Sequence, residues 1–122
     1  MTNNLNYRRA KFVYKAARLH AIILKCPVIP KSWDNRGEDF KKHFIELVSD
    51  LCSGKYKFEN FEQSHDLWVD KSIKLGWKYG KEYDPDKKIH PDLVSYDKLN
   101  PKEKVKDEVF IRLVEIAKNC IW

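Results

Sequence analysis

The sequence is poor in the residues that define several specialised protein classes. Its 122 residues include only three cysteines, four glycines and one methionine. Cys26, Cys52 and Cys120 are odd in number and far apart, so they favour neither a disulfide framework nor a structural zinc site. No apolar run approaches the ~20 residues of a membrane span, and no apolar signal segment follows Met1. These absences predict a cytoplasmic protein with reduced thiols.

The motifs of the common enzyme classes are also missing. No P-loop, GxGxxG or GxSxG segment occurs, and the four histidines lack metal-ligand spacing. Asp66 and Asp70 would share one helix face, but the neighbouring lysines favour a solvated surface pair. We therefore predict a protein that is not an enzyme and that binds no metal or other cofactor.

Acidic residues are absent from the first 33 positions, which contain seven lysines and arginines. The formal charges of residues 61–122 sum to zero, so the net charge of +6 comes from residues 1–60. Five of the basic residues recur at helical spacing and would lie on one face; they are Arg8, Lys11, Lys15, Arg18 and Lys25. This basic face is either a solvated surface or a site for phosphate groups of nucleic acid or of a nucleotide.

Apolar periodicity predicts two helices in the first half of the chain. The first covers about residues 7–25 and ends before Pro27. Asp34 or Asn35 is the expected cap of the second helix, because each side chain can accept from a free backbone N–H. Gly54 is the expected end of this helix.

Two further helices are predicted in the second half. Asn60 or Ser64 begins the third, and Asn100 caps the fourth in a capping box with Glu103. The predicted buried stripe of the fourth helix is Val105, Val109, Leu113, Ile116 and Cys120. Residues 77–99 form an ordered loop with a short extended piece at 93–96. The predicted fold is mainly α, with about four helices around one core in a single domain of residues 1–122.

Short linked motifs occupy residues 61–119. They read HDLW at 65–68, GWKYG at 76–80, HPDLVSY at 90–96 and EKVKD at 103–107. This series resembles the RyR domain of ryanodine receptors, whose pattern is HxxW, GWxYG, HPxLVxY and ExxxD. Residues 10–52 resemble, more loosely, the N-terminal part of small stand-alone RyR proteins of bacteria and phages. The resemblance implies a bacterial or phage binding module.

The loop motifs also contain groups suited to a planar, charged ligand. Side chains two apart on an extended segment point the same way, so Trp77 and Tyr79 are expected to form one aromatic surface. Nearby lysines could contact a phosphate. The predicted ligand-binding residues are Arg18, Trp77, Tyr79, Lys87, Lys88, His90 and Tyr96. A packing role is the alternative for Trp77, and Tyr96 could instead lock the loop. Trp68 and His65 are predicted as packing and hydrogen-bonding residues.

The resemblance narrows the expected ligand to a nucleotide or a nucleotide-derived signal. RyR domains of the receptors occur as tandem pairs that have been associated with adenine nucleotides, with the tryptophan of GWxYG at the base. One copy is present here, so a comparable pocket requires either a homodimer or the N-terminal helices. The alternative function is an adaptor whose basic first helix binds nucleic acid or an acidic protein.

Overall fold

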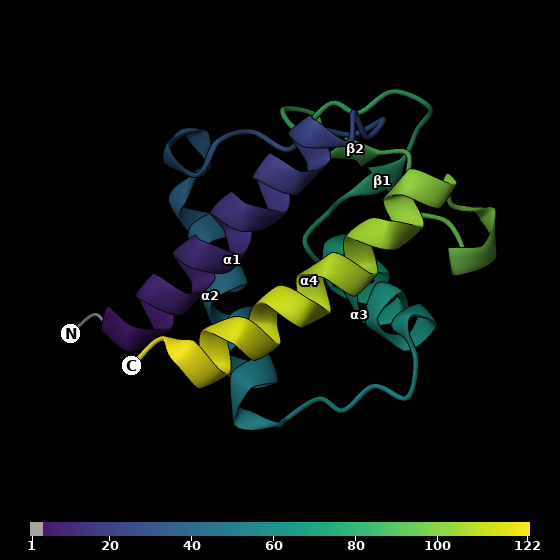
Figure 1. The fold of residues 1–122 in the computed structure, drawn as a ribbon. Helices are drawn as coiled ribbons and strands as arrows, with labels where there is room; N and C mark the ends of the chain where they lie inside the picture. Colours follow the sequence, from purple (N-terminus) through teal and green to yellow (C-terminus); the bar gives the residue numbers. More distant parts are fainter. Residues whose placement is uncertain (1–3) are drawn as a thin grey trace.

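A computed structural model describes residues 4–122 of the chain. Figure 1 shows the four helices α1 (Asn4–Ile23), α2 (Glu38–Ser53), α3 (Phe61–Lys74) and α4 (Pro101–Cys120). The connections contain two short 3-10 helices and two strands: η1 (Trp33–Asn35), η2 (Tyr96–Lys98), β1 (Lys78–Tyr79) and β2 (Ile89–His90). The predicted mainly α fold with four helices is confirmed. Within the described residues, no helix has the length and apolar character needed to cross a membrane.

The central core lies between α1, α2 and α4. Ala10 and Val13 of α1 meet Val48 of α2 and Val114 and Ala117 of α4, and all five are buried. The alanines leave room for close helix packing, and Figure 1 shows α1 and α4 side by side over most of their length. The packed pair α1–α4 is therefore the centre of the fold, and α2 packs against both helices.

The buried face of α4 differs from the predicted stripe. Val105 and Ile116 are 41% and 46% exposed, and Cys120 is also exposed. The face turned inward instead carries Glu103, Val114 and Ala117. The prediction was wrong for Val105, Ile116 and Cys120, whereas Leu113 packs against the core as predicted. It followed the most apolar positions, but a charged residue occupies the buried face of the first turn.

Arginines of α1 hold the C-terminal end of α4. Arg9, which is buried, donates from Nε to the Ile121 carbonyl at 3.0 Å and from Nη2 to the Lys118 carbonyl at 3.1 Å. Arg8 donates to the Trp122 carbonyl at 2.9 Å. The last carbonyls of a helix have no N–H donor within the helix, and these guanidinium groups act as the donors instead.

The helix termini confirm some predicted caps and correct others. Asn60 caps α3 by accepting from the Gln63 N–H, and Gly54 ends α2 with a φ of 84°. The cap of α2 is Gly37, because residues 33–35 form η1. Asn100 caps α4 as predicted, but the capping box is absent, since Glu103 pairs with Lys106 rather than with the cap.

The extended segments lie outside the predicted piece at 93–96. β1 and β2 pair in parallel, with Lys78 opposite Ile89 and Tyr79 opposite His90. Gly80 follows β1 directly, and a Cβ atom there would overlap the Ile89 side chain. The glycine therefore permits the close approach of the two segments that carry the tryptophan and histidine motifs.

Candidate ligand-binding cavity

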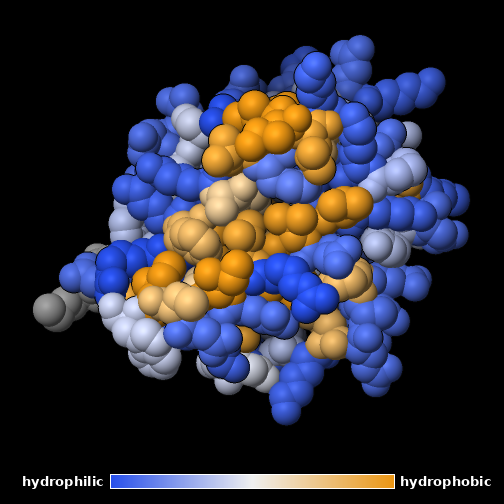
Figure 2. Space-filling model, viewed as in Figure 1, coloured by the Kyte–Doolittle hydropathy of each residue, from blue (hydrophilic) through white to orange (hydrophobic). Residues whose placement is uncertain are grey.

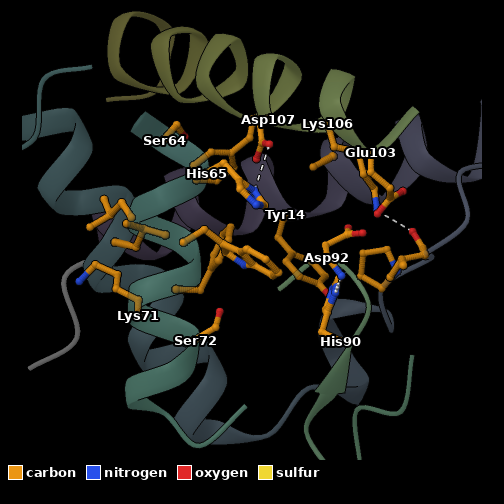
Figure 3. Close-up of a pocket in the computed structure, with 18 of the residues that line it drawn as sticks. Tyr14, Ser64, His65, Lys71, Ser72, His90, Asp92, Glu103, Lys106 and Asp107 are labelled. Carbon is orange, nitrogen blue, oxygen red and sulfur yellow. Dashed lines mark hydrogen bonds and ion pairs between the residues drawn. The ribbon is translucent and has the colours of Figure 1, made fainter. Parts of the chain in front are cut away.

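A cavity of about 280 Å³ lies between the helices and the 77–92 loop. Its walls combine Tyr14 from α1, Phe44 from α2, Trp68 from α3 and Trp77 and His90 from the loop. Figure 3 shows polar side chains of α3, α4 and the loop converging on it. The volume lies near the lower end of the range of about 300–1,000 Å³ for small-molecule pockets. One chain thus encloses a cavity of ligand size.

Aromatic rings surround His90. Its ring centroid lies 4.9 Å from that of Trp68, 5.1 Å from Tyr83 and 5.9 Å from Trp77. The Trp77 and Tyr83 rings are nearly parallel, at 10° and 6.3 Å between centroids. The loop therefore gathers aromatic rings along the cavity wall, against which a planar ring can pack.

The proton of His90 can be assigned from its partners. Its Nδ1 accepts a hydrogen bond from the Asp92 backbone N–H at 3.0 Å, so Nδ1 carries no proton. Burial, and next the nearby Lys106 charge, lower the pKa of His90 to about 4. At neutral pH the imidazole is uncharged and its proton is on Nε2. His90 therefore offers a hydrogen-bond donor in the cavity wall.

His65 links three of the motifs. Its Nε2 donates to the Val94 carbonyl at 2.7 Å, and its Nδ1 lies 3.4 Å from Asp107 Oδ2. Burial favours the neutral ring, but the Asp107 and Val94 contacts prevail and raise the pKa of His65. The predicted hydrogen-bonding role of His65 is confirmed, and this contact joins α3 to both the loop and α4.

A buried pair of carboxyl groups borders the same cavity. The Glu103 side chain is 1% exposed, and its Oε1 accepts from Lys106 Nζ at 3.0 Å. Its Oε2 is buried too, and the Asp92 carboxyl forms a hydrogen bond with the Glu103 side chain. Burial, together with a shared proton and charge repulsion from Glu103, raises the pKa of Asp92 to about 8. Asp92 is thus protonated at neutral pH, while Glu103 remains an acceptor held by Lys106.

Two arginines contribute positive charge. Arg18 Nε donates to the Pro30 carbonyl at 2.8 Å, and Arg36 Nη1 donates to the Tyr83 hydroxyl at 3.4 Å. The Arg36 guanidinium also lies 3.5 Å from the centre of the Phe40 ring. Each guanidinium has further N–H groups, so both arginines can contact an anion from the cavity wall.

Only some of the predicted ligand-binding residues line the cavity. Arg18, Trp77 and His90 line the cavity; Tyr79, Lys87, Lys88 and Tyr96 do not. Tyr79 is 57% exposed, so the expected aromatic surface shared by Trp77 and Tyr79 is absent. Lys88 Nζ instead donates to the Leu75 carbonyl at 2.9 Å. Trp77 lies before β1, which begins at Lys78, so the two aromatic residues do not share one extended strand.

The basic face of α1 is only partly free. Arg8 and Arg18 donate to backbone carbonyls, and Lys11 lies 5.7 Å from the centre of the Tyr7 ring. Lys25 lies beyond the end of α1. The continuous basic helix face predicted from residue spacing is therefore interrupted by intramolecular contacts.

Sequence reasoning missed several cavity residues. These are Arg36, Tyr83, Asp92, Glu103, Lys106 and Asp107. The last three belong to the EKVKD motif, whose spacing puts them on one face of α4. The loop residue Asp92 carries no comparable pattern. Within residues 4–122, no group of three or more histidine, cysteine or acidic side chains could hold a metal ion.

The fold and cavity define a small helical module in which a motif-bearing loop and α4 complete the walls of one cavity. The model of the RyR domain matches residues 42–116, which is more than half of the chain. The protein belongs to the RyR domain family. The match includes most of α2 and extends from there through the first four turns of α4.

Proposed function

We propose that this RyR domain is a non-enzymatic binding module that holds a nucleotide or a nucleotide-derived small molecule in its cavity. The observation that carries the proposal is the joint placement of Trp77, His90 and Arg18 around one cavity. A planar base would stack on the aromatic faces, while an anionic group would contact the guanidinium groups.

The N-terminal helices supply the wall that a second domain would otherwise provide. Tyr14 and Arg18 come from α1, and Phe40 and Phe44 come from α2. Each chain would therefore bind one ligand in its own cavity. The binding role does not depend on self-association.

The polar groups of the cavity support binding more than catalysis. His65 is engaged by Val94 and Asp107, and Cys26, which does not line the cavity, has a pKa raised by burial. Neither arrangement provides an activated nucleophile beside a free base. The proposed role is consequently to hold a ligand.

Self-association forms a separate part of the proposal. Large apolar side chains are exposed near the end of α1, and Figure 2 shows a hydrophobic area where that helix ends in Figure 1. They are Leu19, Ile22, Ile23, Leu24 and Ile29, with exposed fractions between 36% and 65%. Grouped apolar surface of this kind is typical of protein interfaces, and a homodimer would cover it.

Calorimetry and thermal unfolding with a nucleotide panel test the binding role. The panel consists of AMP, GMP, CMP, UMP and a cyclic dinucleotide. A member present at 100 times its dissociation constant is expected to add ~2.7 kcal/mol of stability. A duplex oligonucleotide serves as the comparison. Binding to the duplex without binding to any panel member would favour the adaptor function instead.

A further inference from the structure

Tyr79 is an aromatic residue of the GWKYG motif to which neither the core nor the cavity gives a role. It is 57% exposed, and its ring makes no stacking or cation–π contact among the described residues. Every other tyrosine has a contact of this kind; these are Tyr7, Tyr14, Tyr56, Tyr83 and Tyr96. An exposed ring without such a partner is available to stack on a ring from another molecule.

Exposed lysines lie next to Tyr79 on β1 and on the segment that pairs with it. Lys78 precedes Tyr79 on the strand, and Lys81 follows two positions after it. Lys87 and Lys88 directly precede β2, and the Lys78 N–H donates to the Lys88 carbonyl at 2.9 Å. All four lysines are exposed. The strand pair therefore brings together cationic side chains from two segments of the loop.

Three of these lysines have free ammonium groups. Lys78, Lys81 and Lys87 form no side-chain ion pair or hydrogen bond within residues 4–122. Lys88 differ from them, because its Nζ donates to the Leu75 carbonyl at 2.9 Å. The three free ammonium groups are therefore available to an anionic partner, while Lys88 adds a charge that is fixed at the end of α3.

The acidic residues of the same loop neutralise only part of this charge. Asp86 forms an ion pair with Lys31 at 3.0 Å. Asp84 Oδ1 accepts from the backbone N–H groups of Asp86 and Lys87, at 3.2 Å each. Glu82 is exposed. In the part of the chain that the structure describes, Glu82 and Asp84 are thus the two carboxylates of residues 78–88 without a cationic partner, and the four lysines outnumber them.

An exposed aromatic ring among free lysines fits a single-stranded nucleic acid. An unpaired base presents a face that can stack on the ring, and the phosphates next to that base attract the ammonium groups. In a duplex the bases are already stacked on one another, so the ring would contribute nothing. An acidic peptide would contact the lysines and leave the ring without a role.

We propose that the outer surface of the β1–β2 pair binds single-stranded nucleic acid, with Lys78, Tyr79, Lys81 and Lys87 as the contact residues. The tyrosine ring stacks on one base, and the three free lysines contact the neighbouring phosphates. None of the four residues lines the cavity, so this site is separate from the proposed nucleotide-binding function. It is also separate from the basic face of α1.

Fluorescence anisotropy of the whole chain with a labelled oligodeoxythymidine of about 12 nucleotides tests the site. Three phosphate contacts predict that the affinity falls about 20-fold between 50 and 200 mM salt. No binding at the lower salt concentration, or equal or tighter binding of a duplex of the same length, would overturn the proposal. Displacement by poly-glutamate as effective as displacement by unlabelled oligodeoxythymidine would also overturn it, in favour of an acidic protein partner.

Two variants of Tyr79 test the stacking contact. Tyr79→Ala is expected to weaken binding of the oligonucleotide at least about fivefold, because the stacking face is removed. Tyr79→Phe keeps the ring and should retain the affinity within about twofold. Wild-type affinity in Tyr79→Ala, or an equal loss in both variants, contradicts stacking on this ring.

Three lysine variants locate the phosphate contacts. Lys78→Gln and Lys87→Gln should each lower the slope of log affinity against log salt by about 0.7. Lys118→Gln is the matched control, since Lys118 is exposed near the end of α4, which lies away from β1 and β2 in Figure 1. An unchanged slope in the first two variants, or an equal change in all three, would refute the assignment; circular dichroism verifies that each variant is folded.

Discussion

At the residue scale, the two aromatic side chains of the GWKYG motif have separate environments. Trp77 lines the cavity and stacks beside Tyr83, whereas Tyr79 is 57% exposed and lies outside the cavity. They are two positions apart, which makes them a matched pair for mutation. A difference in ligand affinity between the two alanine variants would therefore reflect contact with the cavity rather than damage to the strand.

Trp77→Ala is expected to weaken binding of the best panel nucleotide at least tenfold, because the stacking face is removed. Tyr79→Ala should leave affinity within about twofold, since its contacts lie outside the cavity. Calorimetry gives the affinities, and chemical unfolding verifies that both variants are folded. Equal losses in both variants would show that ligand stacking does not involve Trp77.

His90 provides a pH prediction. Its pKa falls to about 4 on folding, from an ordinary value of 6.5. The unfolded chain therefore binds the proton first, so the contribution of His90 to stability is present above pH 6.5 and disappears as the pH falls toward 4. The full loss is expected to be about 3 kcal/mol.

The test replaces His90 with asparagine, whose carbonyl oxygen can still accept from the Asp92 N–H. The free energy of unfolding of His90→Asn should fall less between pH 7 and pH 4.5 than that of the wild type. His43→Asn is the control, because His43 is exposed on α2. An identical pH slope in the wild type and His90→Asn would refute the neutral, buried state of His90.

At the element scale, the two short strands position the tryptophan and histidine motifs. Each has only two residues, and the contact depends on the absence of a side chain at Gly80. Gly80→Ala is expected to cost about 1–3 kcal/mol of stability, because its methyl group displaces Ile89. The binding of the best panel nucleotide should weaken together with this loss, since Trp77 and His90 flank the displaced segment.

Gly37→Ala is the control for Gly80→Ala, since no atom lies within 4 Å of a Cβ at Gly37. Its φ of −70° also suits any residue. Chemical unfolding should show a change below about 1 kcal/mol. A larger loss in Gly37→Ala than in Gly80→Ala would mean that the strand contact contributes little to stability.

The helices were more predictable than the segments between them. Side-chain caps such as Asn60 and helix-ending glycines such as Gly54 act over one turn, so the sequence contains their whole signal. The parallel pair β1–β2 has no periodic pattern, because two residues are too few to show alternation. Part of the inward face of α4 was missed for a different reason: Glu103 is buried by pairing with Lys106, which hydrophobicity does not indicate.

The cavity was predicted only in part. Trp77, His90 and Arg18 were found from motif and charge, and the structure brings them together. Lys87 and Lys88 were expected from their nearness in sequence to His90, but they lie outside the cavity. Distance along an irregular loop is a poor guide to distance in space, since the turn at Lys88, with a φ of 57°, redirects the chain.

At the scale of the whole molecule, the exposed apolar surface predicts self-association. Leu19 and Ile23 are 57% and 65% exposed on the last turns of α1. Sedimentation at micromolar concentration is expected to show a species heavier than the 14.6 kDa chain. Ile23→Glu should shift the population toward that monomer mass, because the charge would be buried in the interface. A single monomeric species for the wild type would reject the homodimer.

The contacts of Arg8 and Arg9 with residues 118–122 place the first turns of α1 beside the end of α4. In Figure 1 the start of α1 and the end of α4 accordingly lie at the same corner of the molecule, away from the loop that carries β1 and β2. A short peptide could therefore join the start of α1 to the end of α4 without crossing the cavity. The same geometry suits head-to-tail fusion of copies, and it suits a circular permutant opened between Gly54 and Asn60, where the backbone connects α2 to α3. Fluorophores attached at the start of α1 and the end of α4 would report fraying of this helix pair while leaving the cavity accessible.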